Sequence, residues 1–333
     1  MSGDLGVGIV GCGLIGEKRA GALGSAKLVA CADLVGERAR AMAQKYPHAK
    51  AASDWRDLLD IEGVDIVIVA TTVGSLAEIC EAALRAGKHV LVEKPVARSV
   101  RELAHVIEVA EPSGKLVRVG FNHRYHPAAL KAYEIFSTGA LGEMMFVRGR
   151  YGHGGRIGYD KEWRADPRLS GGGELIDQGV HLIDLARRFL GDFTETGGFA
   201  HTYFWEMPVD DNAFMLLKTA GKQAAFLHVS CTEWKNLFSF EIYGRDAKLH
   251  WEGLGGSYGV ERLSYYKMLP RMGPPETMIW EYQMGDRSWE LEFAEFVDDI
   301  RLNRVPRANL HDALAALEIV EKICRESGYD YYT

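Results

Sequence analysis

Short apolar runs alternate with stretches of helical spacing along the first third of the chain. The runs are rich in β-branched residues and poor in charge, as is typical of strands buried on both faces of a parallel sheet. Five strands are predicted, at residues 6–10, 27–33, 64–71, 89–94 and 116–121. Helices are predicted between them, at 17–22, 37–46, 76–86 and 100–110. Such alternation with short connections indicates an α/β fold with a doubly wound parallel sheet.

The pattern changes after residue 122. A helix is predicted at 127–139, followed by strands at 143–151, 198–205, 212–219, 224–233, 238–243 and 248–251. Consecutive strands without intervening helices favour a mostly antiparallel sheet. The chain ends in two helical patterns, at 289–302 and 310–327. We therefore expect a domain over 1–122 and an α+β domain with an open sheet over 123–333, with the final helices packing back on the first domain.

Composition narrows the class of protein. The apolar fraction of 47% and the charged fraction of 26% are those of a globular protein, and the net charge of −7 argues against nucleic acid or anionic membranes as partners. Apolar runs stay shorter than the ~20 residues that span a bilayer, and the N-terminus does not resemble a signal peptide. The five cysteines are scattered without a C-x-x-C pair. We expect a cytoplasmic protein with reduced thiols and no metal site.

The first strand leads into a glycine-rich turn. Gly11, Gly13 and Gly16 fit the G-x-G-x-x-G fingerprint of dinucleotide sites. The first glycine permits the tight turn, the second lets a pyrophosphate approach the backbone, and the third allows close helix–strand packing. The helix that begins near Leu14 and Ile15 would hold the pyrophosphate on its free N–H groups.

Asp33 lies at the end of the second strand, 20 residues beyond Gly13. An acid there can accept hydrogen bonds from the adenosine ribose and repels a 2′-phosphate, so NAD is favoured over NADP. The alternative is that Asp33 merely caps a strand–helix turn.

Three residues suggest acid–base chemistry. Asp177 and His181 are four apart in a predicted helix over 174–185, so they share one face. Lys94 follows the fourth strand, at the carboxyl edge where open α/β sheets bind ligands. Lys94 could polarise a substrate oxygen while His181 takes a hydroxyl proton and Asp177 orients it. The alternatives are an internal Asp–His pair in the helix and a surface ion pair of Lys94 with Glu93.

The motifs together resemble one family. They are Gly11-x-Gly13-x-x-Gly16, Asp33, Glu93-Lys94-Pro95, Gly120-Phe121-Asn122-x-Arg124 and Gly171-Gly172-Gly173-x-x-x-Asp177-x-Gly179-x-His181. The pattern is similar to the glucose–fructose oxidoreductase/inositol dehydrogenase/rhizopine-catabolism (Gfo/Idh/MocA) oxidoreductases. The resemblance implies a Rossmann domain and an open antiparallel sheet through which homodimers or homotetramers form. It also implies hydride transfer between a pyridine nucleotide and a secondary alcohol or ketone carbon of a sugar, inositol or sugar nucleotide, in either direction.

The resemblance also implies roles for particular residues. The catalytic set is Lys94, Asp177 and His181. The cofactor-binding set is Gly11, Gly13, Leu14, Ile15, Gly16, Asp33, Thr71, Thr72, Glu93, Lys94 and Asn122. The chain departs from the family at residues 72–76, where Thr-Val-Gly-Ser-Leu replaces a frequent Pro-Asn-x-x-His, so the contacts on the nicotinamide side stay open.

The substrate is less defined. Residues 151–173 are rich in glycine, arginine and aromatics, and the candidate contacts are Arg124, Tyr151, His153, Trp163 and Arg164. Aromatics suit sugar rings or a nucleobase, and arginines suit phosphates or carboxylates. We therefore expect a sugar nucleotide or another anionic sugar, with an inositol or a free aldose as the alternative. A further alternative is a non-catalytic NAD-binding sensor, and a tightly bound, internally recycled NAD also stays open.

Overall fold

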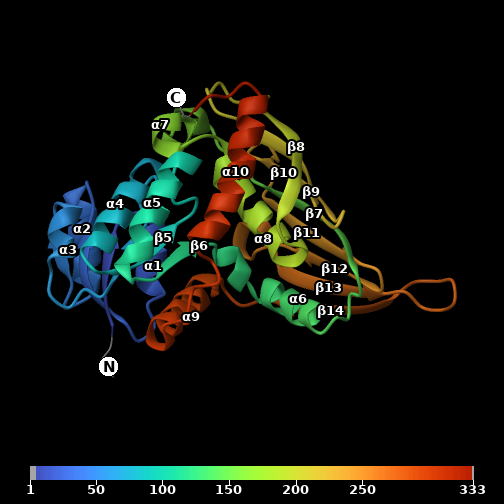
Figure 1. Cartoon of the computed structure of the whole chain (residues 1–333), viewed down its shortest axis with the longest axis horizontal. Helices are drawn as coiled ribbons and strands as arrows, with labels where there is room; N and C mark the ends of the chain where they lie inside the picture. Colours follow the sequence, from blue (N-terminus) through green and yellow to red (C-terminus); the bar gives the residue numbers. More distant parts are fainter. Residues whose placement is uncertain (1–4, 332–333) are drawn as a thin grey trace. The chain divides into compact units, whose positions relative to one another are not determined.

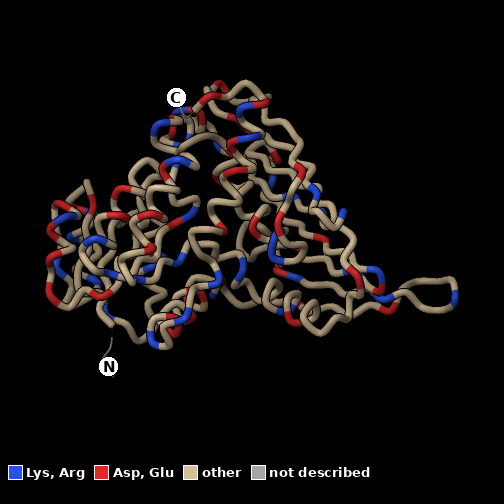
Figure 2. The backbone as a smooth tube through the Cα atoms, viewed as in Figure 1, with Lys and Arg blue, Asp and Glu red and all other residues tan. Residues whose placement is uncertain are grey.

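The computed structural model describes residues 5–331 and contains two compact units, each with its own sheet (Figure 1). The first unit is the chain up to Asn122 together with Trp289–Leu314. The second is His123–Ser288 together with the chain from Ala315. Positively and negatively charged residues are interspersed along the backbone of both units (Figure 2). No helix within 5–331 is long and apolar enough to cross a membrane.

The first unit has a six-stranded parallel sheet in the order β3-β2-β1-β4-β5-β6, which confirms the predicted doubly wound fold. The strands are β1 (Gly6–Val10), β2 (Lys27–Ala32), β3 (Lys50–Ala52), β4 (Ile66–Val69), β5 (His89–Glu93) and β6 (Val117–Gly120). The helices are α1 (Leu14–Gly21), α2 (Gly36–Lys45), α3 (Trp55–Leu59), α4 (Val73–Arg85) and α5 (Val100–Ser113).

Two short elements of this unit were not predicted. β3 has only three residues, Lys50, Ala51 and Ala52, at the sheet edge, and most of it is exposed. Such a strand has no apolar run to reveal it, because it buries little side-chain surface. The five-residue α3 is likewise too short for a helical repeat.

Helix α9 (Ser288–Leu302) belongs mostly to the first unit although it comes late in the chain. Its Phe293 and Phe296 are buried in one core with Val7 and Ile68 of the sheet. Helix α10 (Leu310–Glu326) begins in the first unit and continues in the second.

The second unit has an eight-stranded sheet in the order β14-β13-β12-β11-β7-β10-β9-β8. Neighbouring strands are antiparallel except β7 and β10, which are parallel. The strands are β7 (Met144–Gly152), β8 (Phe193–His201), β9 (Asn212–Thr219), β10 (Ala224–Ser230), β11 (Leu237–Gly244), β12 (Ala247–Glu252), β13 (Glu261–Lys267) and β14 (Glu276–Tyr282).

The predicted strand at 198–205 was misplaced, and two strands were missed. β8 is mostly exposed and contains two adjacent glycines, so its pattern is weak, and the prediction moved to the aromatic residues that follow it. β14 is likewise mostly exposed, and β13, although it is largely buried, lay outside every predicted strand.

Helices cover one face of this sheet. Helices α6 (Pro127–Ser137) and α8 (Val180–Leu190) pack on it, with the short α7 (Pro167–Ser170) in the preceding loop (Figure 1). Side chains of β7 alternate accordingly: Val147 is buried toward the helices, whereas Arg148 and Arg150 are exposed on the other face.

Candidate cofactor and catalytic residues

The glycine-rich turn joins β1 to α1 and leaves room beside its backbone. Gly11 has φ +95°, and a side chain there would meet the Ala70 carbonyl oxygen at 2.4 Å. Gly13 caps α1 without a side-chain hydrogen bond, and a β-carbon added at Gly13 would meet open space. Open space next to the first-turn N–H groups fits a bound pyrophosphate.

The Asp33 carboxylate is held in place at the end of β2. Its Oδ2 accepts a hydrogen bond from the Cys12 N–H at 2.7 Å, and its Oδ1 accepts one from the Val35 N–H at 2.8 Å. The neighbouring Leu34 is fully exposed. A fixed acid beside an exposed apolar side chain fits an adenosine ribose and its base, so the residues present suit NAD.

Lys94 follows β5 directly and is half-buried. The preceding Glu93 is buried and accepts a hydrogen bond from Arg19 Nε at 2.7 Å, while Arg19 Nη1 donates to Glu292 Oε2 of α9 at 2.5 Å. Burial alone would lower the pKa of Arg19, but the two carboxylates outweigh it and raise that pKa. The main chain before Lys94 is thus tied to α1 and α9.

The other predicted cofactor residues also follow strands of this sheet. Thr71 and Thr72 lie between β4 and α4, where Ser75 Oγ donates to Thr71 Oγ1 at 3.0 Å. Asn122 is buried and begins a short turn after β6. These residues therefore gather at the carboxyl edge of the parallel sheet with Gly11, Asp33 and Lys94.

Asp177 and His181 belong to the second unit. The segment around them was predicted as one regular helix, but it contains the π-helical turn η4 (Leu175–Gly179), and α8 begins only at Val180. Asp210 anchors the start of η4, because its carboxylate accepts hydrogen bonds from the N–H groups of Gly173 and Leu175. π-helical turns are found frequently at functional sites.

His181 is buried and Asp177 is partly exposed. The His181 ring contacts the His123 ring edge-on, with 3.9 Å between centroids, and lies 6.3 Å from Tyr151. Arg164 Nε donates to Asp177 Oδ2 at 3.3 Å. Burial alone would lower the pKa of Arg164, but the charge and hydrogen bond of Asp177 together with Tyr159 and Glu174 raise that pKa.

Glu174 connects a second group of polar side chains. It is buried, accepts a hydrogen bond from the Tyr159 hydroxyl at 2.9 Å and lies 3.3 Å from His153 Nε2. Burial alone would lower the pKa of His153, but the hydrogen bond and charge of Glu174 together with the charge of Asp177 raise that pKa. Burial raises the pKa of the nearby Tyr258 to about 12. Neither Glu174 nor Tyr258 was predicted, although Glu174 precedes Asp177 by only three residues.

Two candidate substrate residues are engaged within the chain. Arg124 is buried and donates from Nε to Asp184 Oδ2 at 2.7 Å, with a second bond from Nη2 to Oδ1. This pair fixes the turn after Asn122 to α8. Trp163 is 37% exposed, and the Arg164 guanidinium lies over its ring at 4.5 Å.

The cysteines and the potential metal ligands concern two other kinds of site. All five cysteines are buried. Within residues 5–331, no group of three or more His, Cys, Asp or Glu side chains is arranged to hold a metal ion.

Family models match both parts of the chain. Residues 5–121 match the model described as "Oxidoreductase family, NAD-binding Rossmann fold", and residues 129–250 match "GFO/IDH/MocA C-terminal domain". Among solved structures, levoglucosan dehydrogenase in complex with NADH and levoglucosan superposes with a TM-score of 0.90 over 98% of both chains, at 22% identity. At that identity the likeness shows the fold.

Three named relatives are similar in sequence. Levoglucosan dehydrogenase of Pseudarthrobacter phenanthrenivorans is 30% identical over 239 residues, which are 65% of this chain and 59% of that protein. Inositol 2-dehydrogenase of Salmonella typhimurium is 35% identical over 150 residues, 43% and 45% of the two chains. The scyllo-inositol 2-dehydrogenase (NAD(+)) of Bacillus subtilis is 26% identical over 305 residues, 88% and 84% of the chains. The matches to the first two thus span about half of each relative.

Proposed function

Because this chain belongs to the Gfo/Idh/MocA oxidoreductase family and contains an NAD-binding Rossmann domain, we propose that it is an NAD-dependent dehydrogenase of neutral sugars or cyclic polyols. The named relatives act on levoglucosan and inositols, which carry no charge. The proposal departs from the sugar nucleotide expected from the sequence.

One observation carries that choice. The arginines that suggested an anionic substrate each have a carboxylate partner within the second unit. The pairs are Arg124–Asp184, Arg156–Glu162, Arg164–Asp177 and Arg168–Asp166. An arginine already neutralised by a carboxylate attracts a phosphate weakly, because a ligand anion must compete with the internal one. The hydroxyls of a neutral polyol need hydrogen bonds but no net charge.

The proposed chemistry uses three residues. NAD+ held by the glycine-rich turn and Asp33 would supply the hydride acceptor for the carbinol carbon. Lys94 holds the reacting oxygen by a hydrogen bond, and His181 takes the hydroxyl proton, so that the secondary alcohol becomes a ketone. Asp177 orients the substrate or His181, and Arg164 holds Asp177 in place.

A substrate panel tests this function. NADH formation is measured with levoglucosan, myo-inositol, scyllo-inositol and free aldoses beside UDP-glucose and glucose 6-phosphate. We expect turnover of neutral compounds. Turnover confined to the phosphorylated compounds would reject the neutral class, and NAD binding without any turnover would favour the sensor.

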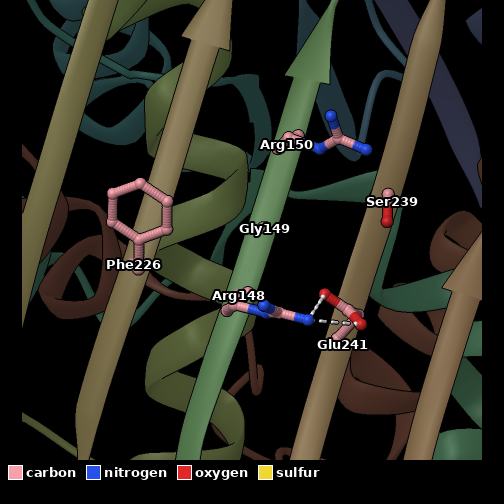
Figure 3. A pocket seen from close by; sticks show the side chains of 6 residues that line it. All are labelled: Arg148, Gly149, Arg150, Phe226, Ser239 and Glu241. Atoms are coloured by element: carbon pink, nitrogen blue, oxygen red, sulfur yellow. Dashed lines mark hydrogen bonds and ion pairs between the residues drawn. The ribbon is translucent and has the colours of Figure 1, made fainter.

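We also propose that the exposed face of the eight-stranded sheet binds a second copy of the chain. Phe199, Leu216 and Phe226 lie on this face and are 51%, 61% and 48% exposed. Phe226 also lines a pocket together with Arg148, Arg150 and Ser239, in which Glu241 is bonded to Arg148 (Figure 3). An apolar patch rimmed by polar groups is typical of a protein interface.

A further inference from the structure

Several loops of the second unit meet at one edge of its sheet, the one at which strands β7, β8 and β10 end. β7 and β10 are parallel, and their last residues, Gly152 and Ser230, are paired. The loops that follow these strands therefore begin side by side. β8 and β9 pair at His201 and Asn212, and Asn212 is paired with Ser230, so the 202–211 loop lies at the same edge.

Four aromatic rings form a continuous row at this edge. Tyr159 and Trp205 have centroids 5.6 Å apart, Trp205 and Phe204 4.9 Å, and Phe204 and Trp234 5.7 Å. We call these four residues the aromatic shelf. Exposure rises along it, from 4% at Tyr159 to 55% at Phe204 and 84% at Trp234. The buried end is joined to the polar residues described above, because the Tyr159 hydroxyl donates to Glu174.

Glycines let the backbone of one loop lie close to the aromatic residues of the other two. A side chain at Gly155 would meet the Trp205 ring at 2.4 Å, and one at Gly154 would meet the Trp234 carbonyl oxygen at 2.8 Å. The N–H of Glu233 donates to the His153 carbonyl oxygen at 3.1 Å. The loop that presents Trp234 is thus fixed to the loop that carries His153.

Trp234 itself is held in an unfavourable backbone conformation. Its φ is +56°, in the left-handed region that non-glycine residues avoid. Strain of this kind persists where surrounding contacts enforce it, and it is concentrated at binding and catalytic sites. Here it presents a tryptophan ring that is 84% exposed. A side chain that only filled a core would gain nothing from this conformation.

We propose that the aromatic shelf is a subsite for a second sugar ring, so that the preferred substrate is a glycoside or disaccharide. This rests on the proposed dehydrogenase function. The apolar face of a pyranose packs on aromatic rings, and the polar residues at the buried end suit hydroxyl groups. A nucleotide fits less well, because the charged chain neighbours of these rings, Glu206, Glu233 and Lys235, supply no net positive charge to attract its phosphates.

Kinetics with one-ring and two-ring compounds test the subsite. Glucose, galactose and myo-inositol are compared with maltose, cellobiose, melibiose and galactinol, with NAD in excess. We expect at least one two-ring compound to have a kcat/KM about tenfold above that of its one-ring counterpart, mainly through KM, as one good ring contact provides. Trp234→Ala should abolish this advantage and leave the one-ring values unchanged.

Tyr203→Ala is the matched control. Tyr203 is an exposed aromatic in the same loop as Phe204, but its ring contacts His201 and lies outside the shelf. We expect this variant to keep the preference for two rings.

The outcomes separate the subsite from the function. Turnover of none of these compounds would count against the neutral-sugar dehydrogenase function on which the subsite rests. Turnover of one-ring compounds without any gain from a second ring would overturn the subsite alone. An equal loss on both classes in Trp234→Ala, or a changed oligomeric state with unchanged kinetics, would also overturn it.

Discussion

Arg164 and Asp177 are thirteen residues apart in the chain, yet Arg164 Nε donates to Asp177 Oδ2 at 3.3 Å. The two side chains come from different segments, the short turn at 163–165 and the π-helical turn η4. Asp177, which is proposed for catalysis, is thereby held by the 151–173 segment, which also contains the candidate substrate contacts His153 and Trp163.

Replacing this arginine should affect catalysis more than folding. We expect Arg164→Met to lower kcat about fivefold to tenfold, because a hydrogen bond to a charged group contributes about 1.5–3 kcal/mol and this pair is partly exposed. KM for NAD should not change, and Arg164→Lys should recover most of the activity. Arg168→Met, in the same loop but paired with Asp166, is the control. An unchanged kcat in Arg164→Met would contradict a positioning role.

The proposed catalytic residues predict a much larger effect. Lys94→Met and His181→Ala should each reduce turnover by roughly 10²–10⁴-fold, the contribution typical of a positioned acid or base. NAD affinity measured by calorimetry should be retained in both. Lys88→Met is the control for Lys94→Met, at a half-buried lysine six residues earlier in the chain. His201→Ala is the control for His181→Ala, at an exposed histidine. Full turnover in either catalytic variant would exclude that residue from the reaction.

Coenzyme choice should depend on Asp33. Asp33→Ser removes the carboxylate that would bind the ribose, so we expect the Kd for NAD to rise about tenfold or more. NADP should lose less, because the repulsion of its 2′-phosphate disappears as well. The ratio of the two Kd values is the measurement, with the melting temperature as a check on folding. A ratio equal to that of the wild type would refute the assignment.

Removing the Arg19 guanidinium should lower the stability of the fold by an amount that depends on pH. Arg19→Met leaves Glu93 and Glu292 buried without their cation, which should lower the free energy of unfolding by about 3–5 kcal/mol. Burial raises the pKa of Glu292, and Arg19 opposes that effect. A raised pKa favours the folded state below the unfolded pKa and loses that stability as pH rises. The deficit should therefore be larger at pH 8 than at pH 5 in urea titrations.

Arg19→Met combined with Glu292→Leu completes this test. The double variant removes one of the two unpaired carboxylates, so we expect it to regain part of the lost stability. A double variant no more stable than the single one would show that the cost lies elsewhere.

The proposed interface predicts a change of mass. Leu216→Glu places a charge on the exposed face of the sheet, which should dissociate the oligomer without destabilising the subunit, since Leu216 is already 61% exposed. Light scattering after size exclusion measures the mass. Leu302→Glu, at a residue 67% exposed on α9, is the control. A wild-type protein that is monomeric at micromolar concentration would reject the interface.

The parts of the fold that the sequence predicted are those with buried, repetitive patterns. The strand Ile66–Val69 is fully buried, and its apolar run predicts it. Lys50–Ala52, which was not predicted, and Phe193–His201, which was misplaced, are largely exposed. The residues wrongly assigned to the strand at 198–205 include Phe204 and Trp205. Their apolar character serves ring contacts at a sheet edge rather than a strand.

The candidate site shows that contacts between distant parts of the chain cannot be predicted from the sequence. Lys94, Asp177 and His181 are predicted from a strand end and from residue spacing, which are visible in the sequence, and their catalytic role stays a prediction. Ion pairs across the fold are not visible in the sequence, so the pairing of Arg124 with Asp184, sixty residues away, was not predicted, and a substrate contact of Arg124 stays a prediction. Glu174 was missed for the same reason, because Tyr159 and His153 approach it only in the folded chain.

The π-helical turn at Leu175–Gly179 also bears on how this protein is compared with others. Such a turn contains one residue more than an α-helical turn, and one residue of α-helix corresponds to a rotation of about 100°. Deleting a single residue there would restore regular helix and turn Asp177 away from its direction relative to His181. An alignment of relatives that lack the turn should therefore open a one-residue gap between the glycine run and His181, and the position of that gap decides which acid corresponds to Asp177.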